Sequence, residues 1–566
     1  MKETEFNLLD EGWILARKDD CTVDALSLTD AILRSHEYSG LSGELPTQDV
    51  SVLRLMLAVL HTVFSRYSPD GEYDPPGSVY AAVCRWSELW QAGRFPEKPI
   101  RDYLESWHER FWLFHPERPF YQVVDAGKEK TSADFPVAKL NSSISESNNK
   151  IRLFSSRSGE EKQRLAYPEA ARWLLHINSF DDVSNERGKG TLFPPGIGVA
   201  WLGTLGVIYA QGNSLFETLM LNLIIYDAEH NRLWDDEMPV WEKENVSRSP
   251  RVLISPPTSL SALYTLQSRR TELLRENGFV TGCRIYGGDH FDRVNYFTEP
   301  MTVWGFKKPL PKVGEPETVP KTHDRASQMW REFSSCFTVR NEKGVVSNKI
   351  RRPGTVEWVT KLKKDASRSY IDIDRNRLIR FRICSVEYDG MKSCFVNVFS
   401  DSITFRTDLL TELGRRWQKI ITEEVGKCED LAKKLGFFAK DLELAAGAST
   451  ETAGDNSSVT GAKERFYYEI DIPFREWLEE IDPEWENDSA EERAALEKWH
   501  GTAVSAALRI GRELVASAGT AATVGRYIKD SSDKERFYSS ADAFRDFRYQ
   551  IGKIYPKKNK PKEKQT

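Results

Sequence analysis

The chain has 566 residues, of which 40% are hydrophobic and 29% are charged, and it contains 16 tryptophans. So many large apolar side chains can form a buried core, which excludes a wholly disordered protein, and the length is typical of about two to four domains. The net charge of −6 argues against a free-standing, non-specific DNA-binding protein, because an acidic body repels phosphate. Any nucleic-acid site must therefore be a local basic patch.

Cysteine usage and the N-terminus indicate the cellular compartment. The seven cysteines are widely spaced and include no CxxC pair, which argues against a zinc knuckle and indicates reduced, structural thiols. The N-terminus lacks the apolar stretch of a signal peptide, and the apolar run at 53–64 contains Arg54 and His61 and is too short to span a bilayer. We therefore expect a soluble cytoplasmic protein in which this run belongs to a buried helix.

The first 402 residues mix short strands with helices. A strand is expected at 13–15, and Ser27 is suited to cap the helix that follows it. Strand-like runs broken by Gly and Pro fill 250–310, and an Asp389-Gly390 turn between two β-rich runs predicts a hairpin at 379–398. Further helices are expected at 49–66, 99–112, 161–178 and 213–226.

Long helical periodicity begins after residue 402. The first helix is expected at 407–446, with Leu409, Leu413, Trp417 and Ile420 on one stripe. Three more helices are expected at 463–481, 489–518 and 534–554. The predicted fold is therefore α+β: a large mixed α/β N-terminal domain at 1–402, a C-terminal four-helix bundle at 403–555 and a disordered, Lys-rich tail at 556–566.

The chain lacks the constellations that mark enzymes. Its nine histidines show neither HxH nor HExxH spacing, and neither a Walker A sequence nor a GxSxG elbow occurs. His323-Asp324 resembles the dyad of metal-dependent phosphohydrolases, but no further His-rich motif accompanies it, and the pair is typical of a polar helix start. We therefore expect no catalytic residue, no metal site and no cofactor.

One segment combines the groups that single-stranded nucleic acid requires. Within 141–164, polar amides, cations and an aromatic ring occur close together, and these bind base edges, phosphates and base faces respectively. An ordinary polar loop has the same composition. The candidate residues are Asn148, Asn149, Lys150, Arg152 and Phe154.

Two short turns are suited to contact duplex DNA. Glycines on both sides of Lys189, at Gly188 and Gly190, let the backbone approach a phosphate or enter a groove. At the hairpin tip, a methionine next to a lysine could push between two base pairs. Plain solvated turns remain the alternative at both places. The tip residues are Met391, Lys392 and Ser393.

Several segments, in their order along the chain, resemble the CasA-type large subunit of the type I-E CRISPR Cascade complex. The most distinctive is Trp107-His108-Glu109-Arg110-Phe111-Trp112, continuing through Pro119-Phe120-Tyr121-Gln122. The segments with this resemblance lie at 6–14, 53–58, 107–122, 169–175, 201–203, 217–223, 239–242, 267–270 and 299–304. They span more than half of the chain.

The resemblance implies a recognition subunit and not an enzyme. Members of this family lie near the 5′ handle of the guide RNA, read the protospacer-adjacent motif in double-stranded target DNA, help to open the duplex and recruit a separate helicase-nuclease in antiviral defence. By resemblance, residues 188–190 are the glycine loop at the motif, 391–393 the wedge hairpin, and 148–154 the loop near the RNA handle and the neighbouring subunit. The minor-groove lysine of one family member has no clear counterpart in this chain: the alignment places 287–290 at that position, with Arg293 nearby.

Two alternatives stay open. One is a metal-dependent nuclease using His323 and Asp324, and the other is a purely architectural scaffold subunit without DNA contact. Which protospacer-adjacent motif is read, and whether the chain is stable outside its complex, do not follow from the residues.

Overall fold

The computed structural model divides the chain into two compact units. Unit 1 consists of Met1–Ser327 and Arg340–Ser402, and unit 2 consists of Gln328–Val339 and Ile403–Thr566. The structure describes residues 4–128, 133–143, 157–182, 198–227, 230–244, 247–307, 316–338, 350–366, 377–390, 392, 394–449, 457–529 and 535–556. The predicted tail at 556–566 lies outside these residues except for its first position.

The centre of unit 1 is the helix α2 (Pro46–Arg66), which packs against α5 (Tyr167–Phe180) and α7 (Leu260–Tyr264). Among the described residues it is the one helix long and apolar enough to cross a membrane, yet 94% of its most apolar window is buried in the protein. The predicted buried helix at 49–66 is confirmed. The helix starts three residues earlier because Pro46 occupies its first turn, where a proline loses no hydrogen bond.

The other predicted helices of unit 1 differ from the prediction mainly at their ends, whereas the helices at 79–92 and 354–366 were not predicted. The helix expected at 99–112 ends at Ser106, because Trp112–Phe114 forms strand β5 and pairs with β1 (Glu5–Asn7). The helix expected at 161–178 begins at Tyr167, where Pro168 lies in the first turn. The helices of unit 1 are α1 (Leu28–Leu33), α2, α3 (Val79–Ala92), α4 (Glu97–Ser106), α5 (Tyr167–Phe180), α6 (Leu215–Asn222), α7 (Leu260–Tyr264) and α9 (Gly354–Ala366).

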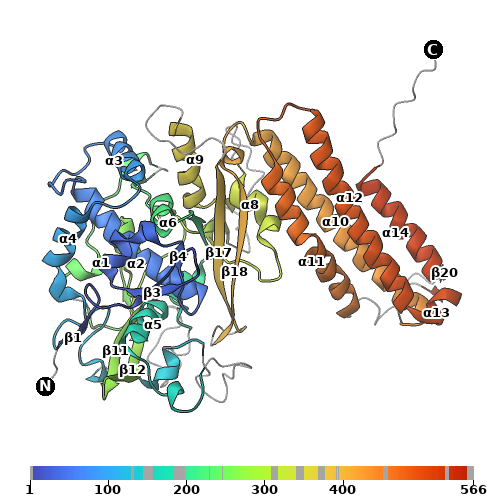
Figure 1. The fold of residues 1–566 in the computed structure, drawn as a ribbon. Helices are drawn as coiled ribbons and strands as arrows, with labels where there is room; N and C mark the ends of the chain where they lie inside the picture. The colour runs from blue at the N-terminus through green and yellow to red at the C-terminus, as the bar shows by residue number, and fades with distance from the viewer. Residues whose placement is uncertain are drawn as a thin grey trace. The chain divides into compact units, whose positions relative to one another are not determined.

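The strands of unit 1 form several small sheets. The two longest strands, β17 and β18, form the predicted hairpin (Figure 1). The three-stranded sheets are β3-β2-β4 (Val23–Leu26, Ile14–Arg17, Gly40–Leu41), β11-β12-β6 (Arg269–Glu276, Phe279–Gly287, Ala133–Pro136), β15-β14-β16 (Thr318–Lys321, Val303–Phe306, Ile350–Arg351) and β18-β17-β7 (Phe395–Arg406, Leu378–Tyr388, Val207–Gln211). The two-stranded sheets are β1-β5, β10-β13 (Val252–Leu253, Asp289–His290) and β8-β9 (Tyr226–Asp227, Arg232–Leu233). The helix α7 interrupts the run of strands expected at 250–310.

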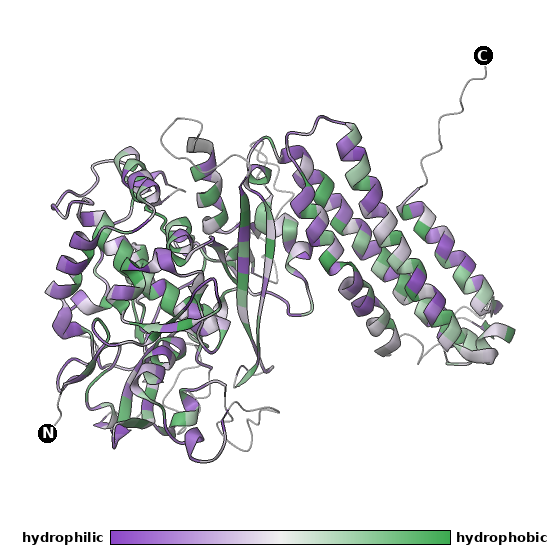
Figure 2. Ribbon diagram, viewed as in Figure 1, coloured by the Kyte–Doolittle hydropathy of each residue, from purple (hydrophilic) through white to green (hydrophobic). Residues whose placement is uncertain are grey.

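Unit 2 is built on four long helices that pack against one another, and the predicted C-terminal helices are confirmed. Figure 2 shows hydrophilic and hydrophobic residues alternating along them. They are α10 (Arg415–Ala446), α11 (Ser457–Glu480), α12 (Ala490–Ser517) and α14 (Ser540–Ile554), accompanied by α8 (Phe333–Phe337), α13 (Gly519–Val524), β19 (Arg526–Lys529) and β20 (Glu535–Tyr538). The mixed α/β part followed by a helical part is the predicted fold class.

Three boundaries in unit 2 differ from the prediction. The helix α11 begins at Ser457 and not at 463. The helix α10 begins at Arg415 and not at 407, so Leu413 precedes the helix and is 47% exposed. The helix expected at 534–554 begins at Ser540, because Glu535–Tyr538 pairs with β19. Unit 2 also includes Trp330, whose ring stacks on Phe474 with centroids 4.3 Å apart.

Candidate nucleic-acid interface

Most of the predicted contact residues lie outside the described part of the chain. Lys392 is described, as are the residues at both ends of the two predicted loops. The undescribed ones are Asn148, Asn149, Lys150, Arg152 and Phe154 within 144–156, Gly188, Lys189 and Gly190 within 183–197, and Met391 and Ser393. The site is therefore built from what surrounds these segments.

Both ends of 183–197 are held by one buried guanidinium. Arg269, on β11, donates from Nε to Asp181 Oδ2 at 2.5 Å and from Nη2 to the carbonyl oxygens of Asp182 and Gly198, each at 3.0 Å. Lys139 Nζ lies 2.6 Å from Asp181 and 3.0 Å from Asp182. Since the charges in this buried cluster are paired, the network fixes the points where the segment leaves and rejoins the core.

The hairpin is attached at the same place. Tyr388, the last residue of β17, donates its hydroxyl to the carbonyl oxygen of Phe180 at 2.5 Å. Burial raises the pKa of Tyr388 well above its usual value, and the carboxylates of Asp181 and Asp182 raise it further, so the phenol stays a neutral donor. A side chain at Gly203 would collide with this hydroxyl. The hairpin tip is thus fixed next to the ends of 183–197.

A tight turn presents Lys392 at the tip. Its backbone N–H donates to the carbonyl oxygen of Asp389 at 2.8 Å, and Asp389 N–H donates to the carbonyl oxygen of Cys394 at 3.1 Å. Lys392 has a φ of 55°, in the left-handed region that favours glycine. The residue as a whole is exposed, and its side chain lines the cavity described next.

A cavity of about 310 Å³ lies between the hairpin tip, Gly198 and the segment that follows β13. Lys392 and Arg293 line it, and neither has an ion pair with any carboxylate among the residues described. Partial burial lowers the pKa of Lys392, and the nearby Arg293 lowers it further. Asp289, also in the lining, is paired with Arg270 at 2.5 Å, and Asp292 accepts a hydrogen bond from Val294 N–H at 3.0 Å. The lining thus carries charges of both signs, and Lys392 and Arg293 are the cations that could contact an anion in this cavity.

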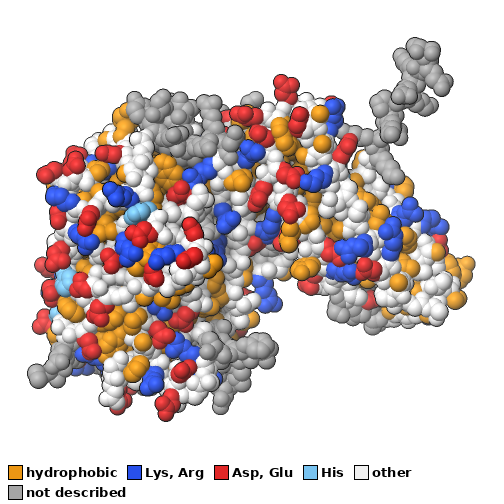
Figure 3. Space-filling model, viewed as in Figure 1, with side chains coloured by type: hydrophobic (Ala, Val, Ile, Leu, Met, Phe, Trp, Pro, Cys, Tyr) orange, Lys and Arg blue, Asp and Glu red, His pale blue; other side chains and the backbone are white. Residues whose placement is uncertain are grey.

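An aromatic wall completes the cavity. Trp201 lies 4.7 Å from Phe291 between ring centroids, and Phe291 lies 4.6 Å from Tyr296. The indole Nε1 of Trp201 donates to Glu299 Oε2 at 2.8 Å, and Glu299 is paired with Arg54 of α2 at 2.9 Å. The wall therefore rests on the central helix. On the face of unit 1 drawn in Figure 3, acidic and basic side chains are interspersed, so basic character is confined to local positions.

Sequence reasoning missed the residues that hold this site together. Arg269 and Asp181 are 88 positions apart, and no spacing rule links a buried arginine to its partner at that distance. One local signal was present: the Asp181-Asp182 pair comes directly before a polar, Gly-containing segment. It could have indicated a network of charged side chains at the ends of that segment. Trp201 and Tyr388 each belong to runs that read as ordinary core.

The nuclease alternative gains no support from the described residues. Asp324 is exposed, and its Oδ1 accepts a hydrogen bond from the Ala326 N–H at 3.0 Å, as in a simple turn. Across the described ranges, no group of three or more His, Cys, Asp or Glu side chains could hold a metal ion.

Comparisons with known proteins agree on one family. The model of the family "CRISPR-associated protein Cse1" matches residues 7–510. The CasA/Cse1 protein of Thermus thermophilus is 35% identical over 282 residues, which are 49% of this chain and 50% of that protein. The alignment thus spans about half the length of this curated relative.

Solved structures extend the likeness over almost the whole chain. The crystal structure of Thermobifida fusca Cse1 matches with a TM-score of 0.78 and 27% identity, covering 97% of this chain and 98% of that one. Cse1 of Acidimicrobium ferrooxidans matches with a TM-score of 0.73 and 22% identity, covering 98% and 100%. These matches define the class as large CRISPR-associated proteins built from a mixed α/β part and a helical part. The chain belongs to the Cse1 family, which confirms the resemblance drawn from its sequence.

Proposed function

We propose that the chain is the large subunit of a Cascade surveillance complex and reads the protospacer-adjacent motif of double-stranded DNA at the cavity beside Lys392. Family membership supports this proposal, and one structure with the same fold is titled "CRISPR RNA-guided surveillance complex", with a TM-score of 0.66 and 15% identity. The other subunits, the guide RNA and a helicase-nuclease recruited after target binding are the partners that this role requires.

One observation carries the proposal: the ends of 183–197, the hairpin tip and the segment with Arg293 converge on one cavity. Cations hold phosphates and aromatic rings stack on bases, so the cavity offers both kinds of contact to a strand. Gly188, Lys189 and Gly190 would enter the groove, and Met391, Lys392 and Ser393 would press between base pairs. A minor-groove reader distinguishes A·T from G·C only coarsely, so we expect several motifs to be tolerated.

We propose that the predicted loop containing residues 148–154 contacts the guide RNA. Its described ends are held in place: Ser143 N–H donates to Asn141 Oδ1 at 2.9 Å, and Arg157 is paired with Glu169 at 2.5 Å. We propose that Asn148, Asn149, Lys150, Arg152 and Phe154 bind the end of the RNA or the neighbouring subunit. This role, like motif reading, uses binding energy and needs no catalytic group.

Co-purification with a guide RNA and the other subunits, followed by binding to duplexes with a randomised motif, tests the function. We expect selection of a short motif. We expect capture of the selected duplex to weaken by about tenfold in each of three kinds of variant: Lys189→Ala, bulky replacement of Gly188 or Gly190, and Arg293→Ala. Each of them removes or displaces a phosphate or groove contact. Lys128→Ala, which changes a 79% exposed lysine elsewhere in unit 1, is the control. Recovery of unselected duplexes by the wild-type complex would show that the chain does not read a motif.

A further inference from the structure

We propose that a second cavity in unit 1, of about 270 Å³, binds an uncharged aromatic small molecule that carries one hydrogen-bonding group. This α2–α3 cavity is lined by α2, α3 and three segments at 73–76, 223–236 and 259–261, and it shares no residue with the lining of the cavity beside Lys392. The proposal therefore does not rest on DNA recognition.

The interior of the α2–α3 cavity is apolar and aromatic. Trp86 and Trp234 line it, and both indole N–H groups are already used: Trp86 donates to the carbonyl oxygen of Met220 at 2.9 Å, and Trp234 to that of Ile224 at 2.6 Å. The half-buried ring of Trp234 therefore offers apolar surface and no free donor, and the fully buried ring of Trp86 supports the wall. Phe64, Leu89 and Leu233 add to that surface. Such walls favour a flat ring over a polar chain.

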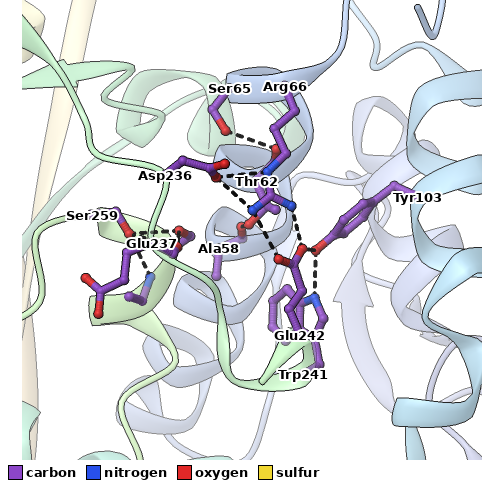
Figure 4. Close-up of polar contacts among 12 residues, drawn as sticks. Ala58, Thr62, Ser65, Arg66, Tyr103, Asp236, Glu237, Trp241, Glu242 and Ser259 are labelled. Carbon is purple, nitrogen blue, oxygen red and sulfur yellow. Dashed lines mark hydrogen bonds and ion pairs between the residues drawn. The ribbon is translucent and has the colours of Figure 1, made fainter. Parts of the chain in front are cut away.

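All four charged side chains in the lining already have partners. Arg66 reaches from α2 to Asp236 at 2.8 Å and to Glu242 at 2.6 Å, as Figure 4 shows. Arg85 pairs with Asp74 at 2.8 Å, and Asp235 lies 3.5 Å from Arg232. An ionised ligand would lose its hydration without gaining a free counter-ion. The charge pattern thus selects an uncharged ligand.

His61 supplies the polar contact. It lies in the C-terminal third of α2, lines the cavity and is 7% exposed, and its buried Nε2 has no hydrogen-bond partner among the described residues. Burial lowers the pKa of His61 to about 3, so near neutral pH the ring is uncharged and holds one donor and one acceptor. A buried polar group without a partner is costly, and a ligand with a matching donor or acceptor would remove that cost. The edge of Tyr264 against the ring, with centroids 5.8 Å apart, holds the imidazole in place.

The size of the cavity sets the class of ligand. Its volume lies just below the range of about 300–1000 Å³ typical of small-molecule sites. A one- or two-ring heteroaromatic compound fits, whereas a nucleotide with its phosphates would be both too large and wrongly charged. Benzimidazole, with a donor and an acceptor on a flat bicycle, is a suitable probe, and naphthalene is its counterpart without a hydrogen-bonding group.

Binding of both probes to the full-length chain, measured by calorimetry and saturation-transfer NMR, tests the proposal. Ala82→Phe fills the cavity from α3, where Ala82 is 3% exposed, and should weaken both probes by at least about tenfold. Ala92→Phe, at an exposed position of the same helix outside the lining, should change neither. His61→Phe should weaken benzimidazole by about fivefold and leave naphthalene unchanged, because one hydrogen bond is lost and the ring is kept.

Three results would overturn the proposal. The first is no binding of benzimidazole to the wild-type chain at millimolar concentration, and the second is binding that Ala82→Phe leaves intact. The third is binding that disappears once guide RNA and partner subunits are added, because a partner's side chain then occupies the cavity. If circular dichroism shows that Ala82→Phe does not fold, Ile225→Phe, at a half-buried position of the lining, replaces it with the same expectation.

Discussion

A buried carboxylate lies in the core of each unit, and the two are held by different partners. Glu299 of unit 1 is fully buried; both of its oxygens bind the guanidinium of Arg54 at 2.9 Å, and Trp201 donates to one of them. Glu424 of unit 2 accepts hydrogen bonds from His500 at 3.0 Å and from Lys427 at 2.6 Å. Trp499 Nε1 and the Tyr555 hydroxyl also donate to Glu424, at 3.1 Å and 3.0 Å. Unit 1 thus pairs its carboxylate with one permanently charged guanidinium behind the wall of its cavity, whereas unit 2 surrounds its carboxylate with four separate donors.

The largest effect is expected where the permanent pair is broken. Glu299→Ala leaves Arg54 buried without a counter-ion and removes the acceptor of Trp201 Nε1, so it should destabilise unit 1 by about 3–5 kcal/mol. Urea unfolding followed by circular dichroism measures this.

The control for this change is Glu37→Ala, which breaks an exposed pair with Arg34 whose side chains are 41% and 42% exposed; it should cost less than about 1 kcal/mol. The double variant Arg54→Met with Glu299→Leu should recover much of the loss, because no unpaired charge remains. Equal costs for Glu299→Ala and Glu37→Ala would show that the pair does not support the core.

A smaller effect that depends on pH is expected in unit 2. Burial by itself raises the pKa of Glu424, but hydrogen bonds from His500 and Lys427 outweigh burial and hold the pKa below its usual value. Its contribution to stability is therefore complete above the unfolded pKa of about 4.3 and is lost as the pH falls through the lower, folded value. Glu424→Gln should cost about 1–3 kcal/mol near neutral pH, and the cost should shrink in acid.

The free energies of unfolding of the wild type and of Glu424→Gln, measured between neutral and acidic pH, test this prediction. Glu423→Gln is the control. Glu423 is the preceding residue, and its side chain is 58% exposed, 3.9 Å from Lys419. A cost for Glu424→Gln that stays constant as the pH falls would exclude the carboxylate as the titrating group.

A third carboxylate sharpens the comparison because it has no cation in direct contact among the described residues. Asp49, in the first turn of α2, accepts a hydrogen bond from Gly43 N–H at 2.7 Å, and burial raises its pKa to about 6. With a raised folded pKa, its contribution is present below the unfolded value of about 3.9 and is lost as the pH rises through about 6.

Asp49→Asn should therefore be more stable than the wild type by about 1–2 kcal/mol above neutral pH, and the difference should vanish in acid. Thermal unfolding across this range measures it. Asp102→Asn, at a 66% exposed side chain, should show no such trend. A variant that is equally or less stable at high pH would mean that the ionised carboxylate is not destabilising at this position.

Local patterns predicted the elements whose own residues determine them. The apolar run of α2 and the Asp389-Gly390 turn of the β17–β18 hairpin carry their signals within a few residues. The stripe through Trp417 likewise predicted α10, although Leu413 was wrongly placed on its buried face. Family membership was predicted from the order of several such segments.

Long-range pairing could not be predicted in this way. Arg269 holds Asp181, Asp182 and Gly198 together, and these contacts form only when β11 packs near the end of α5. Trp330 joins unit 2, with its indole Nε1 2.8 Å from Asp471, although it lies far before the helices in the chain. The local sequence at such positions records that a side chain is buried but not which partner buries it.

The smallest expected effect lies at the hairpin tip, where Lys392 has no ion pair with any described residue, in contrast to the paired charges of the core. Met391→Gly with Lys392→Gly removes the proposed wedge but keeps the turn, because glycine adopts the left-handed backbone of position 392 without strain. Unstacking one base step costs a few kcal/mol, which a wedge and a phosphate contact partly offset. The variant should therefore capture the duplex normally and open it about fivefold more slowly, a change of roughly 1 kcal/mol in the barrier. Stopped-flow measurement of strand opening in the assembled complex, with a fluorescent base next to the motif, follows this step. A target that is already unpaired beside the motif should restore the wild-type rate, whereas the glycine-loop variant Lys189→Ala should gain nothing in capture from it. A tip variant that is equally slow on the pre-opened target would mean that the hairpin acts in motif capture and not in strand separation.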